Sequence, residues 1–220
     1  MNIKNNINIL RQSLPDTCKL VAVSKTKSIE MILEAYKGGQ RVFGENKVQE
    51  LEDKYEQLPK DIEWHMIGHL QSNKIKYIAP FVTLIHSVDS IKLLEEINKQ
   101  GLKVKRVIPC LLQVHIAEEE TKFGFSADEL QEVIKQDQFN QLHHVNVVGL
   151  MGMATFTDDQ RQIRKEFNSL RILFDHLKTM ALPANVTMRE LSMGMSGDYK
   201  IAIEEGSTLI RVGSAIFGGR

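Results

Sequence analysis

Short apolar runs alternate with longer amphipathic stretches along the chain. Several of these runs are almost continuously apolar rather than alternating with polar residues, which is typical of strands buried on both faces. The runs that predict strands cover residues 20–25, 41–46, 63–68, 84–88, 107–116, 147–153, 190–196 and 208–213. A repeat of strand and helix of this kind indicates a parallel sheet with helices packed around it.

The stretches between the strands contain signals for the beginnings and ends of helices. Ser28 can cap a helix with a regularly spaced apolar face, and the glycine pair 38–39 can end that helix. After the fourth strand, Asp89 or Ser90 can cap a second helix, which we expect to end at Gly101. Three further helices are expected, over residues 128–136, 163–177 and 198–205.

Eight strands that alternate with helices predict a (β/α)8 TIM barrel, with a leading N-terminal helix in segment 1–15. The alternative is an open doubly wound sheet, but the first strand is not followed by a GxGxxG motif. No linker rich in Pro, Gly or Ser interrupts the repeat, so we expect one domain over residues 1–220.

The composition narrows the class of protein. Lys plus Arg and Asp plus Glu both number 28, and this zero net charge argues against nucleic acid as a partner. The chain lacks a signal peptide and any apolar run near the ~20 residues of a membrane span, so we expect a cytoplasmic protein with no membrane partner. Cys18 and Cys110 lie in apolar surroundings outside any CxxC motif, and we expect buried thiols. A single neutral domain is compatible with a monomer, which we expect.

Lys25 is the sharpest candidate for chemistry. In a barrel of this kind the working face is at the carboxyl ends of the strands, and Lys25 ends the first strand. A lysine that loses hydration there keeps some neutral amine, which can attack an aldehyde and form a Schiff base. The alternative is an ordinary lysine that extends its amine from the strand end into solvent. The local sequence leaves both interpretations open.

A second signal lies in the loops after the last two strands. Ser196 and Gly197 follow the seventh strand, and Gly213 and Ser214 follow the eighth. Small residues there let backbone N–H groups approach an anion, and phosphate sites in these barrels often use these loops. The alternative is that the glycines only form turns. Arg211, inside the apolar eighth strand, needs a partner that is either an internal carboxylate or a ligand atom.

Other chemistries have little support in the sequence. His65 and His69 are four residues apart, but the glycine between them and the strand-like context argue against a helical zinc site. We therefore expect no metal. The chain also lacks GxxxxGK[ST] and GxSxG, which removes support for a P-loop nucleotidase or a serine hydrolase.

Seven motifs carry a resemblance to a known family. They are VAVSKTKS, FGENKVQE, WHMIGHLQSNK, IHSVDS, KFGF, GLMGM and LSMGMSGDYKIAIEEGSTLIRVGSAIFG. Together and in this order they resemble the pyridoxal 5′-phosphate homeostasis protein family, from about residue 20 to residue 219. The resemblance implies a single barrel related to the barrel domain of alanine racemase, with pyridoxal 5′-phosphate (PLP) as the cofactor.

The resemblance also implies roles for particular residues. Lys25 would form a Schiff base with the aldehyde of PLP. Ser196, Gly213 and Ser214 would hold the phosphate, and Arg211 would face the pyridine nitrogen. Asn46 and His65 match positions that line the cofactor pocket, and Met193 and Met195 would lie in its wall or close behind it.

Two positions depart from the pattern of the family. Lys47 follows FGEN where an aromatic residue is common, and we expect this change to affect only the loop. His115 ends the fifth strand where an asparagine is common, so it is expected to alter the polarity near the cofactor. Neither departure involves the lysine, the phosphate loops or the arginine.

An arginine beside the pyridine nitrogen limits the chemistry. Arginine stays charged and does not hand its proton to the ring, which leaves the ring a weak electron sink. Racemisation also needs a second acid–base group, which the racemase takes from a tyrosine of another domain and subunit. We expect no such domain after the barrel, and the sequence does not direct any tyrosine at the pocket.

The resemblance therefore implies a protein of PLP homeostasis without robust catalysis. Such a protein holds PLP reversibly, limits the free aldehyde and passes PLP to apo PLP-dependent enzymes, with effects on amino-acid balance. The main alternative is a small PLP-dependent amino-acid racemase that uses water or a loop residue as its second base. A third interpretation is an aldolase-like barrel that binds another phosphorylated carbonyl compound through Lys25.

Overall fold

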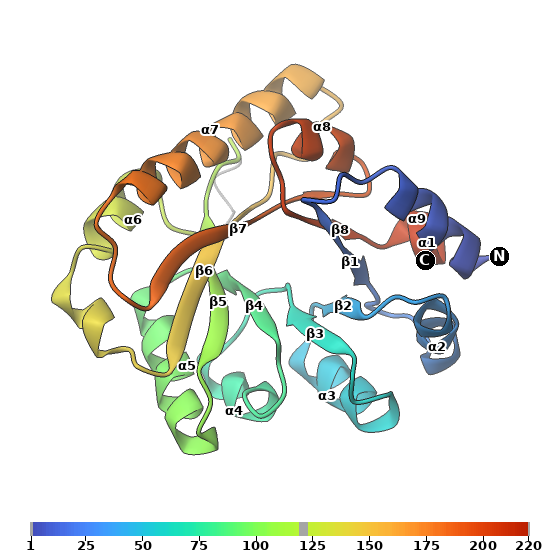
Figure 1. Cartoon of the computed structure of the whole chain (residues 1–220), viewed down its shortest axis with the longest axis horizontal. Coiled ribbons are helices and arrows are strands. Elements are labelled where there is room, and N and C mark those ends of the chain that lie inside the picture. The colour runs from blue at the N-terminus through green and yellow to red at the C-terminus, as the bar shows by residue number, and fades with distance from the viewer. Residues whose placement is uncertain (1, 119–122, 220) are drawn as a thin grey trace.

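Eight parallel strands close into a barrel in the order in which they occur along the chain (Figure 1). A computed structural model describes residues 2–118 and 123–219, so Lys122 of the KFGF motif lies outside the described residues. The strands are β1 Lys19–Val23, β2 Val42–Glu45, β3 Glu63–Met66, β4 Leu84–Val88, β5 Ile108–Val114, β6 Val145–Gly152, β7 Val186–Met195 and β8 Leu209–Val212. β1 pairs with β8, which puts Val21 beside Arg211. The barrel is confirmed and the open sheet is excluded.

Helices surround the barrel and cover its outer surface (Figure 1). They are α1 Ile3–Gln12, α2 Ile29–Lys37, α3 Val48–Gln57, α4 Ile75–Ile78, α5 Ile91–Val104, α6 Ala127–Val133, α7 Gln160–Thr179, α8 Tyr199–Glu204 and α9 Ser214–Phe217, with 3-10 turns η1 Ser72–Lys74 and η2 Asp137–Gln141. The predicted caps Ser28 and Ser90 both accept a hydrogen bond from the first turn of their helix. None of the helices in the described ranges is long and apolar enough to cross a membrane.

Gly101 does not end α5, contrary to the prediction. The helix continues through Gly101 to Val104 and ends at Lys105, which adopts the left-handed conformation. A Cβ atom at Gly101 would lie 2.9 Å from the carbonyl oxygens of Arg106 and His144. The glycine is therefore explained by close packing in the middle of the helix rather than by a helix end. Helix α3 was not predicted, because most of its residues are charged or polar.

The side chains of the strands alternate between the barrel interior and the layer beneath the helices. The interior apolar cluster contains Val21, Leu84, Leu111, Val148, Met151 and Leu209. The neighbours of these residues along the strands, such as Ala22 and Ile210, belong to the larger cluster between strands and helices. This alternation decides which residues at the strand ends reach the inside of the barrel.

Both cysteines are buried and unpaired, as predicted. Burial raises the pKa of the Cys18 thiol to about 11, and it also raises the pKa of Cys110. Both side chains therefore stay in the poorly reactive thiol form at neutral pH.

Candidate functional site

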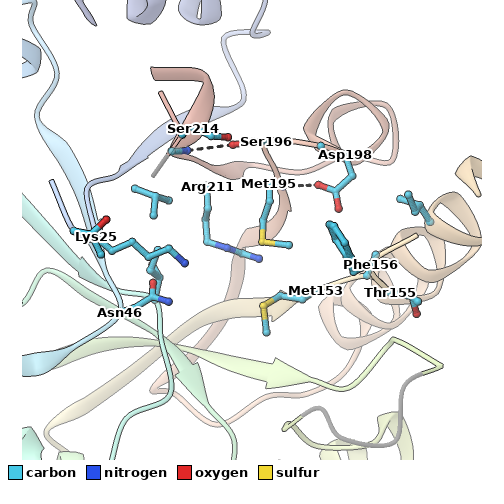
Figure 2. A pocket seen from close by; sticks show the side chains of 18 of the residues that line it. Lys25, Asn46, Met153, Thr155, Phe156, Met195, Ser196, Asp198, Arg211 and Ser214 are labelled. Atoms are coloured by element: carbon cyan, nitrogen blue, oxygen red, sulfur yellow. Dashed lines mark hydrogen bonds between the residues drawn. The ribbon is translucent and has the colours of Figure 1, made fainter. Parts of the chain in front are cut away.

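A cavity of about 520 Å³ opens at the carboxyl ends of the strands (Figure 2). Most of its lining residues lie at the carboxyl ends of β1, β2, β3, β6, β7 and β8 or directly after them, and it extends across the junction where β1 pairs with β8. Six residues that the sequence marked as cofactor-binding line it: Lys25, Asn46, Ser196, Arg211, Gly213 and Ser214. The structure thus brings together side chains that lie far apart in the sequence.

Lys25 follows β1 and its side chain extends into the cavity (Figure 2). Val21 faces the barrel interior and Val23 lines the cavity on the same side, and the turn that follows β1 then carries Lys25 into the cavity. The side chain is half-buried. Among the residues that the structure describes, none accepts a hydrogen bond from the Lys25 amine. The amine is therefore available to a ligand.

Arg211 enters the same cavity from β8, with its guanidinium group opposite Lys25 in Figure 2. The residue is only 4% exposed. Its guanidinium donates to the hydroxyl of Ser192 and to the carbonyl oxygen of Gly152, at 3.1 Å for the latter. Burial lowers the pKa of Arg211 to about 10, and the charge of Asp198 opposes that shift. Arg211 therefore stays cationic at neutral pH, and the two acceptors that hold it are neutral.

The hydrogen bonds continue from Arg211 into the barrel. Ser192 Oγ lies 2.9 Å from His86 Nδ1, and His86 Nε2 lies 2.9 Å from His65 Nδ1. Burial lowers the pKa of His65 to about 3 and lowers that of His86 well below its usual range, so both rings are neutral. Because a guanidinium only donates, Ser192 accepts from Arg211, and hydrogen bonds then connect Ser192 with His86 and His86 with His65. We call these four residues the Arg211 chain.

The loops after β7 and β8 contact each other at one edge of the cavity. The Gly213 N–H donates to Ser196 Oγ at 3.3 Å, and the Met195 N–H donates to Asp198 Oδ1 at 2.5 Å (Figure 2). A Cβ atom at Gly213 would lie 3.0 Å from the carbonyl oxygen of Val23, so the absence of a side chain lets this loop approach β1. Hydroxyl and backbone N–H groups gather here, which is the donor set that binds phosphate.

The opposite wall of the cavity follows β6 and is mostly apolar. It contains Met153, Ala154 and Phe156, and the Phe156 side chain is 97% exposed at the rim. The buried carboxylate of Glu166 in α7 holds this wall, because it accepts from the Thr155 N–H and from the Thr155 hydroxyl, both at 2.7 Å. The cavity therefore has basic groups on one side and an apolar wall on the other.

Two of the expected residues do not reach the cavity. Met193 is fully buried in the layer between the sheet and the helices. Gly194, with a φ of 94°, interrupts the strand alternation, so Met195 lines the cavity instead. His65 lies in the barrel interior and is connected to Arg211 only through His86 and Ser192. Lys47 and His115, the two departures from the family pattern, do not line the cavity either.

The sequence analysis missed the residues that support the site. Ser192 was not singled out, although it lies in β7 with its side chain inside the barrel, where it contacts Arg211 of β8. Lys54 was not singled out either, although it is 5% exposed in an otherwise polar helix. Its signal in the sequence is faint: in α3 it lies three positions after the buried Leu51 and four after Glu50. A free amine, a buried guanidinium and an anion-binding edge in one cavity suit a small anionic carbonyl compound.

Known proteins of two kinds match this chain. A family profile described as the N-terminal domain of alanine racemase matches residues 1–220. A pyridoxal phosphate homeostasis protein of Aquifex aeolicus is 43% identical over 203 residues, which cover 92% of this chain and 87% of that protein. The Homo sapiens pyridoxal phosphate homeostasis protein is 38% identical over 213 residues, covering 92% of this chain and 76% of that protein.

Solved structures agree with the sequence matches. PipY of Synechococcus elongatus without PLP superposes with a TM-score of 0.92 at 37% identity, over 98% of this chain and 100% of that one. The PLP-bound form of PipY gives a TM-score of 0.88 at 36% identity over the same shares. An alanine racemase of Clostridium difficile has a TM-score of 0.82 at 15% identity, covering all of this chain and 57% of that one, which shows a shared fold.

Proposed function

Because this chain belongs to the pyridoxal phosphate homeostasis protein family, we propose that it binds PLP in the cavity at the strand ends and acts in PLP homeostasis. In this proposal the protein holds PLP reversibly on Lys25, limits the free aldehyde and releases PLP to apo PLP-dependent enzymes. A cytoplasmic location and a monomeric state belong to the same proposal. The PLP-bound structure of PipY, a relative with the same fold, supports the identity of the ligand.

One observation carries the proposal: the Lys25 amine and the Arg211 guanidinium enter the same cavity as the donors of Ser196, Gly213 and Ser214. PLP is an anionic phosphate ester with an aldehyde and a pyridine nitrogen, so the donor set fits each of its functional groups. Ser196, Gly213 and Ser214 would hold the phosphate, and Arg211 would lie at the ring nitrogen. When bound, PLP supplies an aldehyde that condenses with a primary amine and releases water.

The remaining expected residues have supporting parts in the proposal. Asn46 would contact the cofactor from the end of β2, where Gly68 lets the next loop pack against it: a Cβ there would lie 2.4 Å from the Asn46 carbonyl oxygen. His65 would act from behind through the Arg211 chain. Met193 would support the wall from the layer beneath the helices.

The surroundings of Arg211 favour a carrier over a racemase. Its pKa of about 10 keeps its proton at neutral pH, so Arg211 does not protonate a ring nitrogen, and the ring would stay a weak electron sink. A second acid–base group on the other face is also required for racemisation. None of the four tyrosines, all of them among the described residues, lines the cavity. The Tyr36 hydroxyl, for example, is hydrogen-bonded to Asp61.

The proposal is tested by absorbance and by borohydride reduction of the purified protein mixed with PLP. We expect an absorbance band near ~420 nm, which belongs to PLP bound to a lysine. After reduction, mass spectrometry should find pyridoxyl phosphate on Lys25. Lys25→Ala should lose the band and the adduct, whereas Lys27→Ala is the matched control because Lys27 also lines the cavity.

Two results would contradict the proposal. A wild-type protein that takes up no PLP would reject PLP binding altogether, and an adduct on Lys27 alone would reject Lys25 as the anchor. Exchange of the α-hydrogen of amino acids in deuterated water then separates carrier from racemase. A carrier should show no exchange above that of free PLP at the same concentration.

A further inference from the structure

A buried lysine lies next to the strand end that positions Lys25, on the outer side of the barrel. Lys54 belongs to α3 and is 5% exposed. Its ammonium group donates to the carbonyl oxygen of Ser24 at 2.7 Å, to Glu45 Oε1 at 2.7 Å and to Glu50 Oε1 at 2.6 Å. An ammonium group has three N–H donors, so all of them are used. We call Ser24, Glu45, Glu50 and Lys54 the Lys54 cluster.

The Lys54 cluster holds the backbone on both sides of Lys25. On one side, Lys54 binds the Ser24 carbonyl oxygen, and the Ser24 hydroxyl donates to Glu45 Oε1 at 2.6 Å. On the other side, the Thr26 N–H donates to Glu50 Oε1 at 2.5 Å. Lys25 is therefore the one residue between two points that are both fixed by Lys54, directly at Ser24 and through Glu50 at Thr26.

The backbone at this position needs such support. Thr26 has a φ of 63°, in the left-handed region that β-branched residues rarely adopt. A conformation of this kind persists only where surrounding contacts enforce it, and such positions cluster at functional sites. Two hydrogen bonds hold it here: the Thr26 N–H donates to Glu50, and the Lys27 N–H donates to the Ser24 carbonyl oxygen at 3.0 Å and closes a turn around Lys25 and Thr26.

The chemistry of the cluster also points to a role beyond stability. Glu45 is fully buried, and within the described part of the chain its Oε2 atom has no hydrogen-bond partner. Buried ion pairs often contribute less to stability than well-packed apolar side chains of similar volume. A charged cluster with an unpaired oxygen is thus a costly way to attach α3 to the barrel, but it fixes two backbone groups next to Lys25.

We propose that Lys54 and Glu50 are positioning residues for Lys25, because the Lys54 cluster fixes Ser24 and Thr26 in the conformation that aims the Lys25 amine into the cavity. This inference rests on the proposed role of Lys25 as the PLP anchor. It predicts that loss of the cluster slows capture of PLP by Lys25 and leaves the phosphate-binding loops intact, because those loops follow β7 and β8.

The test compares Glu50→Ala with Glu50→Gln, which retains an oxygen that accepts from Thr26 and Lys54. Glu50→Ala should slow the formation of the borohydride-trapped adduct on Lys25 by at least about tenfold, because small displacements of a reacting group are costly. Glu50→Gln should recover most of the rate. Glu56→Ala is the matched control, since Glu56 is an exposed residue of the same helix.

A second ligand separates positioning from general damage. Pyridoxine 5′-phosphate carries an alcohol in place of the aldehyde and cannot form a Schiff base with Lys25, so its affinity reports the phosphate loops and the ring contacts without that bond. The dissociation constant of pyridoxine 5′-phosphate for Glu50→Ala should stay within about twofold of the wild-type value. This change is well below the tenfold change that corresponds to about 1.4 kcal/mol of binding free energy. Lys54→Met should show the same split between the two ligands wherever it folds.

Each outcome decides the inference. If Glu50→Ala captures PLP at the wild-type rate, or if it loses both ligands to the same extent, the positioning role is rejected. If the wild-type protein forms no adduct on Lys25, the proposed function fails instead, and the affinity for pyridoxine 5′-phosphate shows whether the cavity still binds the phosphate.

Discussion

Two basic residues reach the same cavity from paired strands, and the protein holds them in different ways. Lys25 is fixed through its backbone by a charged cluster on the outer side of the barrel, and its amine is left without a partner among the described residues. Arg211 is fixed through its guanidinium by neutral groups inside the barrel. Lys25 therefore has a fixed backbone and a free amine, whereas Arg211 is fixed at its guanidinium group.

The difference matches the chemistry that each side chain would perform. An amine that forms and breaks a covalent bond must be free to approach the aldehyde carbon and to withdraw from it, so the protein fixes its backbone and leaves its tip mobile. A guanidinium that supplies only a constant charge works best when it does not move. The two hydrogen-bond acceptors of Arg211 are neutral and, among the described residues, only the charge of Asp198 acts against its own, so an anionic ligand suits this part of the cavity.

The largest expected loss of stability comes from a substitution in the charged Lys54 cluster. Lys54→Met leaves Glu45 and Glu50 together without their cation, and we expect the free energy of unfolding to fall by about 3–5 kcal/mol in urea denaturation. Arg164→Ala is the control, because the ion pairs of Arg164 with Glu204 and Glu205 are on the surface and are worth less than about 1 kcal/mol. Equal losses in both variants would contradict the special status of the Lys54 cluster.

A substitution among the neutral residues that hold Arg211 should reduce the free energy of unfolding by less. His86→Leu removes the central member of the Arg211 chain and leaves Ser192 with Arg211 as its remaining partner and a ring nitrogen of His65 without its partner. We expect a loss of about 2–3 kcal/mol in the same measurement, since each buried unpaired polar group costs about 1–3 kcal/mol. The affinity for pyridoxine 5′-phosphate should fall as well, because Arg211 loses its fixed position. A loss of stability with unchanged affinity would separate the chain from the site.

A change of pH sharpens the comparison with a smaller effect. The pKa of His65 is about 3 in the folded protein and near 6.5 when unfolded, so its contribution is complete above pH 6.5 and is lost as the pH falls toward 3. From pH 7 to pH 5 we expect His65 alone to cost about 2 kcal/mol. His65→Asn should flatten this acid dependence in urea melts, and an unchanged slope would contradict the assignment.

The charged side should respond to pH with the opposite sign. Burial raises the pKa of Glu45 in the folded protein, although the charge of Lys54 opposes that shift. The contribution of Glu45 is therefore present below its unfolded pKa and is lost as the pH rises through its folded pKa. Lowering the pH should therefore reduce the stability contributed by the neutral His65 of the Arg211 chain. The same change should reduce the cost of burying Glu45 in its charged form. The Glu45→Gln variant, measured beside His65→Asn, separates these two contributions.

Much of the fold could be predicted from the sequence because its signals are local. Buried parallel strands are apolar runs and helix starts such as Ser28 are single residues, so the eight strands and most helices follow directly. Gly101 shows the limit. A glycine within a helix and a glycine after a helix look alike in the sequence, and only the approach of His144 from another element tells them apart.

The site was predictable where residues lie at strand ends and less so behind them. Lys25, Ser196 and Arg211 follow from the rule that ligands bind at the carboxyl ends of barrel strands. Met193 does not line the cavity, because the left-handed Gly194 interrupts the alternation of β7 between Met193 and Met195, and the sequence pattern does not show this interruption. Lys54 could not be predicted, since its partner Ser24 lies 30 positions away and only the packing of α3 on the barrel joins them.

The pairing of β1 with β8 also affects the protein while it is being synthesised and folded. The cavity extends across that junction, so a chain emerging from the ribosome carries Lys25 early but gains Arg211, Gly213 and Ser214 only with its last strand. Closure of contacts so distant in sequence is slow. A ligand that needs both sides of the junction binds closed barrels only and stabilises them by mass action. The supply of PLP would in this way influence how many newly made copies of this protein escape quality control.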